Sequence, residues 1–365
     1  MINGIFNRHL IDIHSMEYSQ TKLFGENQYI TGTHAMSILG LSRHTFEKMV
    51  QEGLIARSDI NGHIAYDKGV VEAFKQHPEY IRIQNGVLDE RNQLNDLTGK
   101  DWLPETKSYF YQKGLGANHP DAQIEKQHPA PFSFQDIERL ILFFTKKGMN
   151  VLDPFGGVGS TAKACAVSGR HCTSIELSPK YHNLSIERLE KEVGRGTSTH
   201  HNLINGDSCQ LLPTYKAGTF DFIVTSPPYW GILHKQDQKV VKNRVANNLD
   251  THYSDDDKDL GNISDYEKFL DILIEKVFME CARVLKHNKY MAIVVSDFRD
   301  KGEYVSFHSD IICRMKNRPV KEGGCMVLQG TKILIQNHKS LLPYGYPFSY
   351  VENIHHQYVL IFRKK

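Results

Sequence analysis

The sequence lacks several features that would assign it to a specialised class of protein. It contains no run of the roughly 18 consecutive apolar residues that a membrane-spanning helix needs. Residues 1–20 have no cationic start followed by an apolar stretch, so no secretory signal is expected. Six cysteines are present, but no two are spaced as Cys-x-x-Cys, which argues against a zinc site. We therefore expect a cytoplasmic protein with reduced thiols, no metal and no membrane partner.

An excess of charge of one sign is also lacking. The 44 Lys and Arg residues nearly balance the 42 Asp and Glu residues, which leaves a formal charge of +2 at pH 7. Such a balance neither requires nor excludes a nucleic-acid partner, and a DNA-binding surface would have to gather its basic side chains on one face. The 365 residues contain no internal repeat and are enough for one large domain and a small one.

A compact pattern of short elements follows an undistinguished lead of residues 1–26. Residues 27–80 predict two helices joined by a turn at 40–42, a hairpin turning at Asn61-Gly62 and a third short helix. The pattern resembles the winged helix-turn-helix modules of excisionases and MerR-type regulators. That resemblance implies three basic side chains available to a major groove, namely Arg43, His44 and Lys48. The alternative is a helical bundle used for packing or dimerisation.

After a polar linker expected over residues 81–100, residues 101–365 alternate strand-like and helix-like stretches. NVLDPF, HCTSIEL, FDFIVTS and YMAIVVSDF are short apolar runs that suit buried parallel strands. The closing runs KILIQN and HQYVLIFRKK predict an antiparallel pair of strands. The sequence thus predicts an α/β fold, with a Rossmann-like sheet that carries helices on both faces and a small, mainly helical domain before it.

A glycine-rich turn follows the first of these strands, in MNVLDPFGGVGST, residues 149–161. The strand ends at Asp153, and Gly157 and Gly159 let the backbone approach a ligand at the start of a helix. Two further acids, Glu176 and Asp207, end the next two strands. A carboxylate at the position of Glu176 suits the two hydroxyls of a ribose. Three acids at successive strand ends predict one ligand-binding edge of the sheet.

The clearest signal is FDFIVTSPPYW, residues 220–230, in which an apolar strand runs into the tetrapeptide Ser226, Pro227, Pro228 and Tyr229. Two prolines fix φ and stop the strand. The tetrapeptide suits an exocyclic base amine as substrate. Such an amine is a poor nucleophile, because its lone pair is delocalised into the ring. A side-chain oxygen of Ser226 and the carbonyl of Pro227 can accept its two N–H bonds and free the lone pair. Tyr229 can then stack on a base flipped out of the duplex.

Together, DPFGGVGST and SPPY resemble the amino-methyltransferase family of DNA enzymes, whose hallmark is [D/N/S]-P-P-[Y/F/W]. The resemblance covers roughly residues 101–365. It implies S-adenosyl-L-methionine as the methyl donor, double-stranded DNA as the substrate and a bacterial, archaeal or phage origin. It also implies that Asp207 meets the adenine amino group of the cofactor and that Phe155, within the matching loop, lies in its pocket.

Two further points of the resemblance concern segments around the loop. The segment His-Pro-Ala-Pro-Phe, ending at Phe132, resembles the tenth motif of the family, which lines the cofactor pocket. Many family members place the SPPY tetrapeptide before the glycine loop, whereas here it follows the loop. Such a circular rearrangement changes connectivity but leaves the strand ends together.

Serine at the first position of the tetrapeptide favours cytosine N4 as the target, because adenine enzymes more often have Asp or Asn there. An N6-adenine methyltransferase is the first alternative, and RNA or a protein glutamine are further substrates with such an amine. Cytosine-C5 chemistry fits poorly, since the chain has no Pro-Cys pair. A DNA-binding regulator with an inert methyltransferase-like domain is the alternative from another class. A homodimer, a cognate restriction endonuclease and a restriction-modification role stay open.

Three other segments suggest contacts with substrate. Residues 231–264 are polar and are expected to form a target-recognition loop, with basic side chains for phosphates at Lys239, Lys242 and Arg244. Asp297 and Arg299 either face the flipped base or pair with one another. An aromatic group near the C-terminus either lines the base pocket or packs in the core, namely Tyr344, Tyr346 and Phe348.

Overall fold

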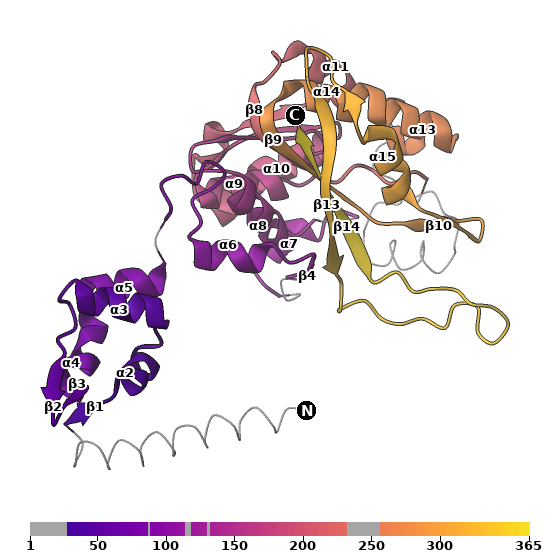
Figure 1. Ribbon diagram of the computed structural model, residues 1–365. Helices are drawn as coiled ribbons and strands as arrows, with labels where there is room; N and C mark the ends of the chain where they lie inside the picture. The colour runs from indigo at the N-terminus through magenta and orange to yellow at the C-terminus, as the bar shows by residue number, and fades with distance from the viewer. Residues whose placement is uncertain (1–27, 87, 114–117, 130–131, 232–255) are drawn as a thin grey trace. The chain divides into compact units, whose positions relative to one another are not determined.

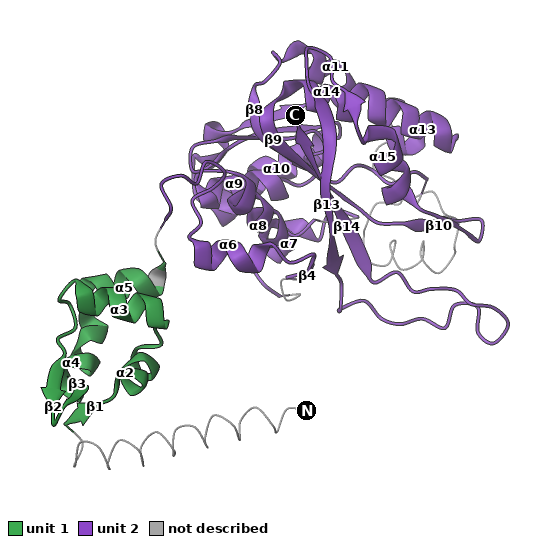
Figure 2. Ribbon diagram, in the orientation of Figure 1, with its two compact units in different colours: residues 1–87 green, residues 88–365 purple. Residues whose placement is uncertain are grey.

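The computed structural model describes residues 28–86, 88–113, 118–129, 132–231 and 256–365 (Figure 1). The chain forms two compact units, residues 1–87 and residues 88–365 (Figure 2). Within the described ranges, no helix is long and apolar enough to cross a membrane.

In the first unit, short helices pack with a three-stranded antiparallel sheet. Helices α2 (Gly32–Leu39) and α3 (Arg43–Gln51) are joined by a tight turn, in which Gly40 has a φ of 62° and the Ser42 side chain accepts a hydrogen bond from the amide of Thr45. The strands pair in the order β1-β3-β2, with bounds Tyr29–Ile30 for β1, Ser58–Ile60 for β2 and His63–Asp67 for β3. Asn61 and Gly62 both have positive φ, as a type I′ hairpin requires.

The first unit extends past the boundary predicted at residue 80. Helix α4 (Lys68–Ala73), the 3-10 turn η1 (Phe74–Gln76) and helix α5 (Pro78–Asn85) follow β3. The Tyr80 hydroxyl donates to the Leu39 carbonyl at 2.9 Å, and Ile83 packs against the same core. The expected linker over 81–100 therefore begins inside a packed helix, because Tyr80 and Ile83 attach helix α5 to the core of the first unit.

The second unit is built on a nine-stranded sheet with the order β7-β6-β5-β8-β9-β14-β13-β12, and β4 pairs with β13. Strands β5 to β9 are parallel, while β14 runs antiparallel to both β9 and β13. The predicted antiparallel pair near the C-terminus is thus confirmed. The bounds are Tyr109–Tyr111 (β4), Asn150–Asp153 (β5), His171–Glu176 (β6), Asn202–Asn205 (β7), Phe220–Thr225 (β8), Leu285–Val295 (β9), Arg318–Pro319 (β12), Cys325–Ile335 (β13) and His356–Lys364 (β14).

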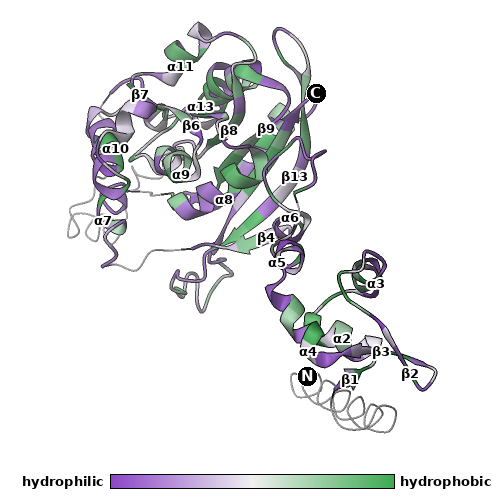
Figure 3. Cartoon of the chain, turned by 90° about the vertical axis from the view of Figure 1, so that its left-hand side faces the viewer, coloured by the Kyte–Doolittle hydropathy of each residue, from purple (hydrophilic) through white to green (hydrophobic). Residues whose placement is uncertain are grey.

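Side chains alternate along the central strands and fill two apolar clusters, one on each face of the sheet. Ile223 and Ile293 belong to one cluster, whereas their strand neighbours Phe222 and Val294 belong to the other. Figure 3 shows the apolar colouring along β8 and β9 that this double burial requires. Because both faces of these strands are buried, nearly every position along them is apolar, which explains the continuous apolar runs in the sequence.

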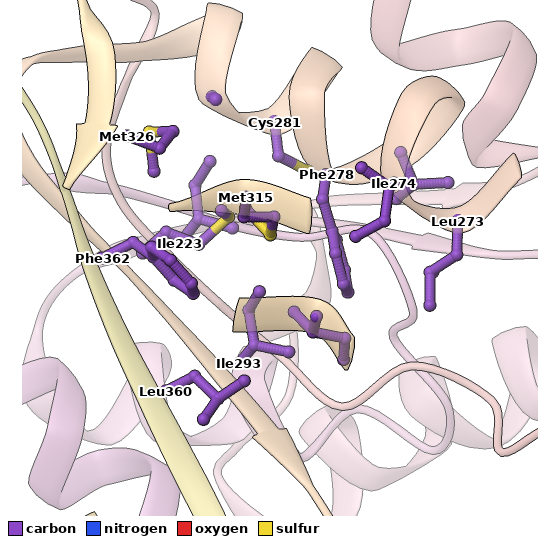
Figure 4. Packing of buried hydrophobic residues seen from close by; sticks show 14 of the residues in the cluster. Ile223, Leu273, Ile274, Phe278, Cys281, Ile293, Met315, Met326, Leu360 and Phe362 are labelled. Atoms are coloured by element: carbon purple, nitrogen blue, oxygen red, sulfur yellow. The ribbon is translucent and has the colours of Figure 1, made fainter. Parts of the chain in front are cut away.

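Different helices cover the two faces. The cluster with Phe222 contains residues of α8 (Phe134–Phe144), α9 (Ser160–Ser168) and α10 (Pro179–Glu192). The cluster with Ile223 contains residues of α13 (Tyr266–Ile272), the π-helical segment η5 (Leu273–Phe278), α14 (Met279–Val284) and α15 (Phe307–Met315). Figure 4 shows Phe278 reaching from η5 towards Ile223 and Ile293. The predicted α/β fold with helices on both faces is confirmed, while the helix-turn-helix assignment stays a prediction.

The remaining elements are short. They are α6 (Gly99–Glu105), α7 (Ala122–Glu125), η2 (Thr197–His200), α11 (Ser208–Leu211), η3 (Leu212–Thr214), η4 (Leu260–Asn262), β10 (Phe298–Asp300) and β11 (Glu303–Val305). The order of the parallel strands reverses at β5, which lies between β6 and β8. In sheets of this kind, ligands bind outside the carboxyl ends of the strands at such a reversal point.

Candidate active site

A cleft lies at the carboxyl ends of β5, β6, β7 and β8, with an empty volume of about 1010 Å³ that includes its open mouth. The residues that follow these four strands form much of its wall. The residues predicted for cofactor binding and catalysis line it, except Gly159: they are Phe132, Asp153, Phe155, Gly157, Glu176, Asp207, Ser226, Pro227, Pro228 and Tyr229. The structure therefore brings the glycine loop and the SPPY tetrapeptide to one cleft.

Asp153 holds the glycine loop against the neighbouring strand. Its carboxylate accepts hydrogen bonds from the hydroxyls of Thr161 and Thr225 and, at 3.0 Å, from the amide of Phe155. Burial raises its pKa to about 6, against the opposing effect of these three bonds. Because each bond comes from the protein itself, the geometry favours a positioning role for Asp153 over direct contact with a ligand.

The glycines allow close approach between elements. A Cβ on Gly156 would lie 2.0 Å from the Ser174 hydroxyl oxygen of β6, and a Cβ on Gly159 would lie 2.8 Å from the Cβ of Ser185 in α10. The amides of Phe155, Gly156, Gly157 and Gly159 donate to acceptors within the protein. The loop therefore offers a ligand few free amides, and Gly156 and Gly159 chiefly let the loop pack closely against β6 and α10.

Glu176 also lies in the wall of the cleft, and its carboxyl group is hydrogen-bonded to the glycine loop. One oxygen accepts from the Gly157 amide at 2.7 Å and the other from the Ser178 amide at 2.8 Å. Burial raises its pKa to about 7, although both amide bonds act to lower it. Each oxygen keeps a further lone pair, so a donor in the cleft can still bond to this carboxylate.

Asp207 begins α11 and accepts a hydrogen bond from the Cys209 amide at 2.8 Å. It is partly exposed and lines the cleft.

Phe132 and His128 also line the cleft, and the His128 ring meets the Tyr181 ring edge-on, with 4.7 Å between the ring centroids. Residues 130 and 131, within the predicted tenth motif, lie outside the described ranges.

A buried charge cluster fastens the Phe132 segment to helices α9 and α10, although no motif in the sequence indicates such a cluster. Arg188 of α10 is fully buried and bonds to Glu125 and Glu192. Its guanidinium also donates to the Ser160 hydroxyl at 3.0 Å, and that hydroxyl donates to the carbonyl of Phe132. Arg188 thereby links the start of α9 to the segment that carries Phe132.

The tetrapeptide follows β8, and a hydrogen-bond network holds its tyrosine. The Tyr229 hydroxyl accepts from the Gln357 side-chain amide of β14 at 3.1 Å. Burial raises the pKa of Tyr229, while hydrogen bonds from Ser226, Gln357 and the backbone of Ser296 oppose the rise. The Ser226 hydroxyl is hydrogen-bonded to Tyr229 and keeps a lone pair for another donor, which is what an amine substrate requires. Gln357 was missed by sequence reasoning, although a glutamine in an apolar strand is a signal of a specific partner.

Asp297 does not pair with Arg299. It accepts from the His308 imidazole and amide and from the Tyr304 hydroxyl at 2.9 Å. Burial acts to raise the pKa of Asp297, but these bonds outweigh it and hold the pKa below its usual range. The Arg299 guanidinium lies over the Tyr304 ring, 5.3 Å from its centroid.

None of the other predicted residues is among the described residues that line the cleft. Arg43, His44 and Lys48 are exposed on α3 of the first unit, where Arg43 pairs with Glu47 and Lys48 with Glu52. Lys239, Lys242 and Arg244 fall outside the described residues, as does most of the predicted recognition loop. The prediction that the C-terminal aromatic group packs in the core is wrong, because Tyr344, Tyr346 and Phe348 are 52%, 81% and 94% exposed. None of the three lines the cleft.

Fold and site together define a cleft at the carboxyl ends of parallel strands, with the glycine loop and the SPPY tetrapeptide in its wall. A family model described as DNA methylase matches residues 24–187. Over this segment, the chain is similar to that DNA methylase family. The matched segment includes the glycine loop and Glu176 and ends before Asp207 and the tetrapeptide.

Curated relatives match over shorter stretches. The type II methyltransferase M.BglI of Bacillus subtilis is 35% identical over 124 residues, which are 32% of this chain and 33% of that protein. The type II methyltransferase M2.DpnII of Streptococcus pneumoniae is 30% identical over 95 residues, 25% of this chain and 35% of that protein. The chain thus spans about a third of the length of these relatives. A solved DNA modification methylase of Thermus thermophilus, in complex with S-adenosyl-L-methionine, is 27% identical, with a TM-score of 0.28 over 44% of this chain and 53% of its own.

Proposed function

We propose that this protein is an S-adenosylmethionine-dependent DNA methyltransferase that acts on an exocyclic base amine, the N4 amine of cytosine. The observation that carries the proposal is the meeting of the glycine loop and the SPPY tetrapeptide in one cleft. The DNA methylase family of residues 24–187 supports DNA as the substrate class. The names of the curated relatives, which are type II methyltransferases, point the same way.

The side chains of the cleft suit S-adenosyl-L-methionine by their chemistry. The remaining lone pairs of Glu176 suit ribose hydroxyls, and the acceptor oxygens of the Asp207 carboxylate suit an adenine amino group. Phe132, Phe155 and Ile175 offer apolar surface for a purine ring. When bound, the cofactor supplies a methyl group on a positively charged sulfur, ready for direct displacement.

The protein would prepare the amine by orienting it. The Ser226 side-chain oxygen and the Pro227 carbonyl accept the two N–H bonds of the amine and turn its lone pair towards the methyl group. The Tyr229 ring lies beside the base, and Gln357 fixes its hydroxyl end. The rate then comes from positioning, because no group of the protein needs to form a covalent bond with the base.

Serine at position 226 favours cytosine. A neutral hydroxyl that is hydrogen-bonded to Tyr229 presents a lone pair to the amine without placing a charge beside the base. The N6 amine of adenine is the alternative target of the same chemistry.

The test incubates the purified protein with S-adenosyl-L-methionine and duplex DNA from a host without DNA methylation, followed by nucleoside mass spectrometry. N4-methylcytosine supports the proposal. N6-methyladenine keeps the mechanism and corrects the base. Cofactor binding without a methylated nucleoside points to an RNA or protein amine, and absence of cofactor binding points to an inert regulator.

The first unit, we further infer, contributes DNA contacts through Arg43, His44 and Lys48 of α3. All three side chains are exposed on one helix, and the Arg43 pair is too exposed to matter for stability. The triple alanine variant should lose site preference while keeping cofactor affinity. Lys75→Ala, an exposed cation elsewhere on this unit, is the matched control. Unchanged site preference in the triple variant would remove this role.

A further inference from the structure

The loop between β13 and β14, residues 336–355, exposes an unusual amount of apolar surface. Tyr346, Phe348 and Tyr350 are 81%, 94% and 86% exposed, and Leu341 is 80% exposed. Isolated apolar side chains on a surface need no explanation, but so many on one loop mark an interaction surface. We call residues 336–355 the aromatic loop.

The aromatic loop is held in shape by its own hydrogen bonds. At its neck, the Asn353 side chain accepts from the Leu342 amide at 2.9 Å and donates to the Leu342 carbonyl at 2.8 Å. At its tip, the amides of Phe348 and Ser349 both donate to the Gly345 carbonyl. A loop ordered in this way presents its rings to a partner without the full entropic cost of ordering on binding.

The base of the aromatic loop lies beside the tetrapeptide. Residue 356 starts β14, and Gln357, the next residue, donates to the Tyr229 hydroxyl at 3.1 Å. Tyr358 pairs with Val295 at the carboxyl end of β9, the edge of the sheet where β8 delivers Ser226. Figure 1 shows the aromatic loop extending beyond the ends of β13 and β14. The aromatic loop therefore projects from the carboxyl-end edge of the sheet, the same edge at which the cleft lies.

We propose that the aromatic loop is a stacking and wedging surface for the nucleic-acid duplex that flanks the target base, an inference that rests on the proposed function. A duplex that loses one base to the cleft exposes the faces of the neighbouring bases, and aromatic side chains stack on such faces regardless of sequence. Apolar side chains also wedge between base steps and hold a duplex distorted.

Charge is consistent with this partner. Within the aromatic loop, Glu352 is the single acid, and Lys339 is accompanied by His338 and His355. The loop thus brings little repulsion to a polyanion, while its affinity must come from the rings. Contact would then depend weakly on salt compared with contacts made by basic side chains.

The test compares Phe348→Ser/Tyr350→Ser with the wild-type protein. Binding to a fluorescent mixed-sequence 30-base-pair duplex is measured by anisotropy with S-adenosylhomocysteine present, and cofactor affinity is measured separately. We expect duplex affinity to fall roughly tenfold or more, with unchanged cofactor affinity. The ring-retaining variant Phe348→Tyr/Tyr350→Phe should bind the duplex like the wild type, as should Leu103→Ser, which alters a 71% exposed residue on α6.

Equal duplex affinity of the serine variant and the wild type would overturn the proposal. So would an equal loss in the ring-retaining variant, since rings would then not be what matters. A change of oligomeric state with intact DNA binding would assign the loop to a protein contact instead. A wild-type protein that binds cofactor but no duplex would refute the proposed function itself, which is a distinguishable result.

Discussion

The Glu176 carboxyl group should make cofactor affinity depend on pH. Burial raises its pKa to about 7 in the free protein, so near pH 6 only about a tenth of the molecules carry the charged form. Ribose hydroxyls are hydrogen-bond donors and favour the carboxylate. Binding should therefore draw a proton from Glu176, and affinity should fall by up to about tenfold per pH unit below 7 and level off above pH 8.

The raised pKa of Glu176 also determines the direction in which its contribution to folding stability changes with pH. A carboxyl group whose folded pKa is raised contributes stability that is fully present below its unfolded pKa and is lost as pH rises through about 7. A ligand that favours the charged form offsets this loss. The rise in melting temperature on adding S-adenosylhomocysteine should thus be larger at pH 8 than at pH 6.

Calorimetric titration with S-adenosylhomocysteine, in buffers of different ionisation enthalpy, counts the protons released. We expect about one proton at pH 6 and close to none at pH 8.5. Glu176→Gln should bind more weakly, because its amide cannot accept from both Gly157 and Ser178, and should release no proton. Since titration of the ligand is common to both proteins, equal proton release from wild type and variant would refute the reasoning.

Two further predictions concern residues outside the sequence motifs. Gln357→Leu removes a donor to the Tyr229 hydroxyl, so kcat should fall roughly tenfold while the cofactor Kd stays the same. Single-turnover and binding measurements test this prediction. A parallel loss of cofactor affinity would mean a general disruption of the cleft. Arg188→Met leaves Glu125 and Glu192 without their buried cation, which should cost about 3–5 kcal/mol of unfolding free energy in urea titrations. A cost below about 1 kcal/mol would show that Arg188 does not fasten this segment.

Much of the site could be predicted because parallel strands end at one edge. Asp153, Glu176 and Ser226 each follow a buried strand, and the strand rule alone brings them together. The rule does not reveal what each side chain does there. Asp153 is held by Thr161 in the following helix and by Thr225 on another strand, and no local pattern announces a partner 72 positions away.

Other features depend on tertiary contacts that composition cannot distinguish. The rings of Tyr346 and Phe348 suggested core or pocket residues, yet their loop projects them outward because its hydrogen bonds are made by Asn353 and Gly345. Conversely, Arg188 looks like a solvated helix residue and is fully buried. In both cases, contacts made in the folded protein decide whether the side chain is buried or exposed.

The most direct test of the account is methyl transfer to DNA by the wild type and by Ser226→Ala, with cofactor binding measured on the same samples. The account predicts N4-methylcytosine from the wild type. It also predicts unchanged cofactor affinity and a loss of about a hundredfold or more in transfer rate for the variant, because the amine loses an acceptor in the transition state. A Ser226→Ala protein that transfers methyl groups at the wild-type rate would contradict it.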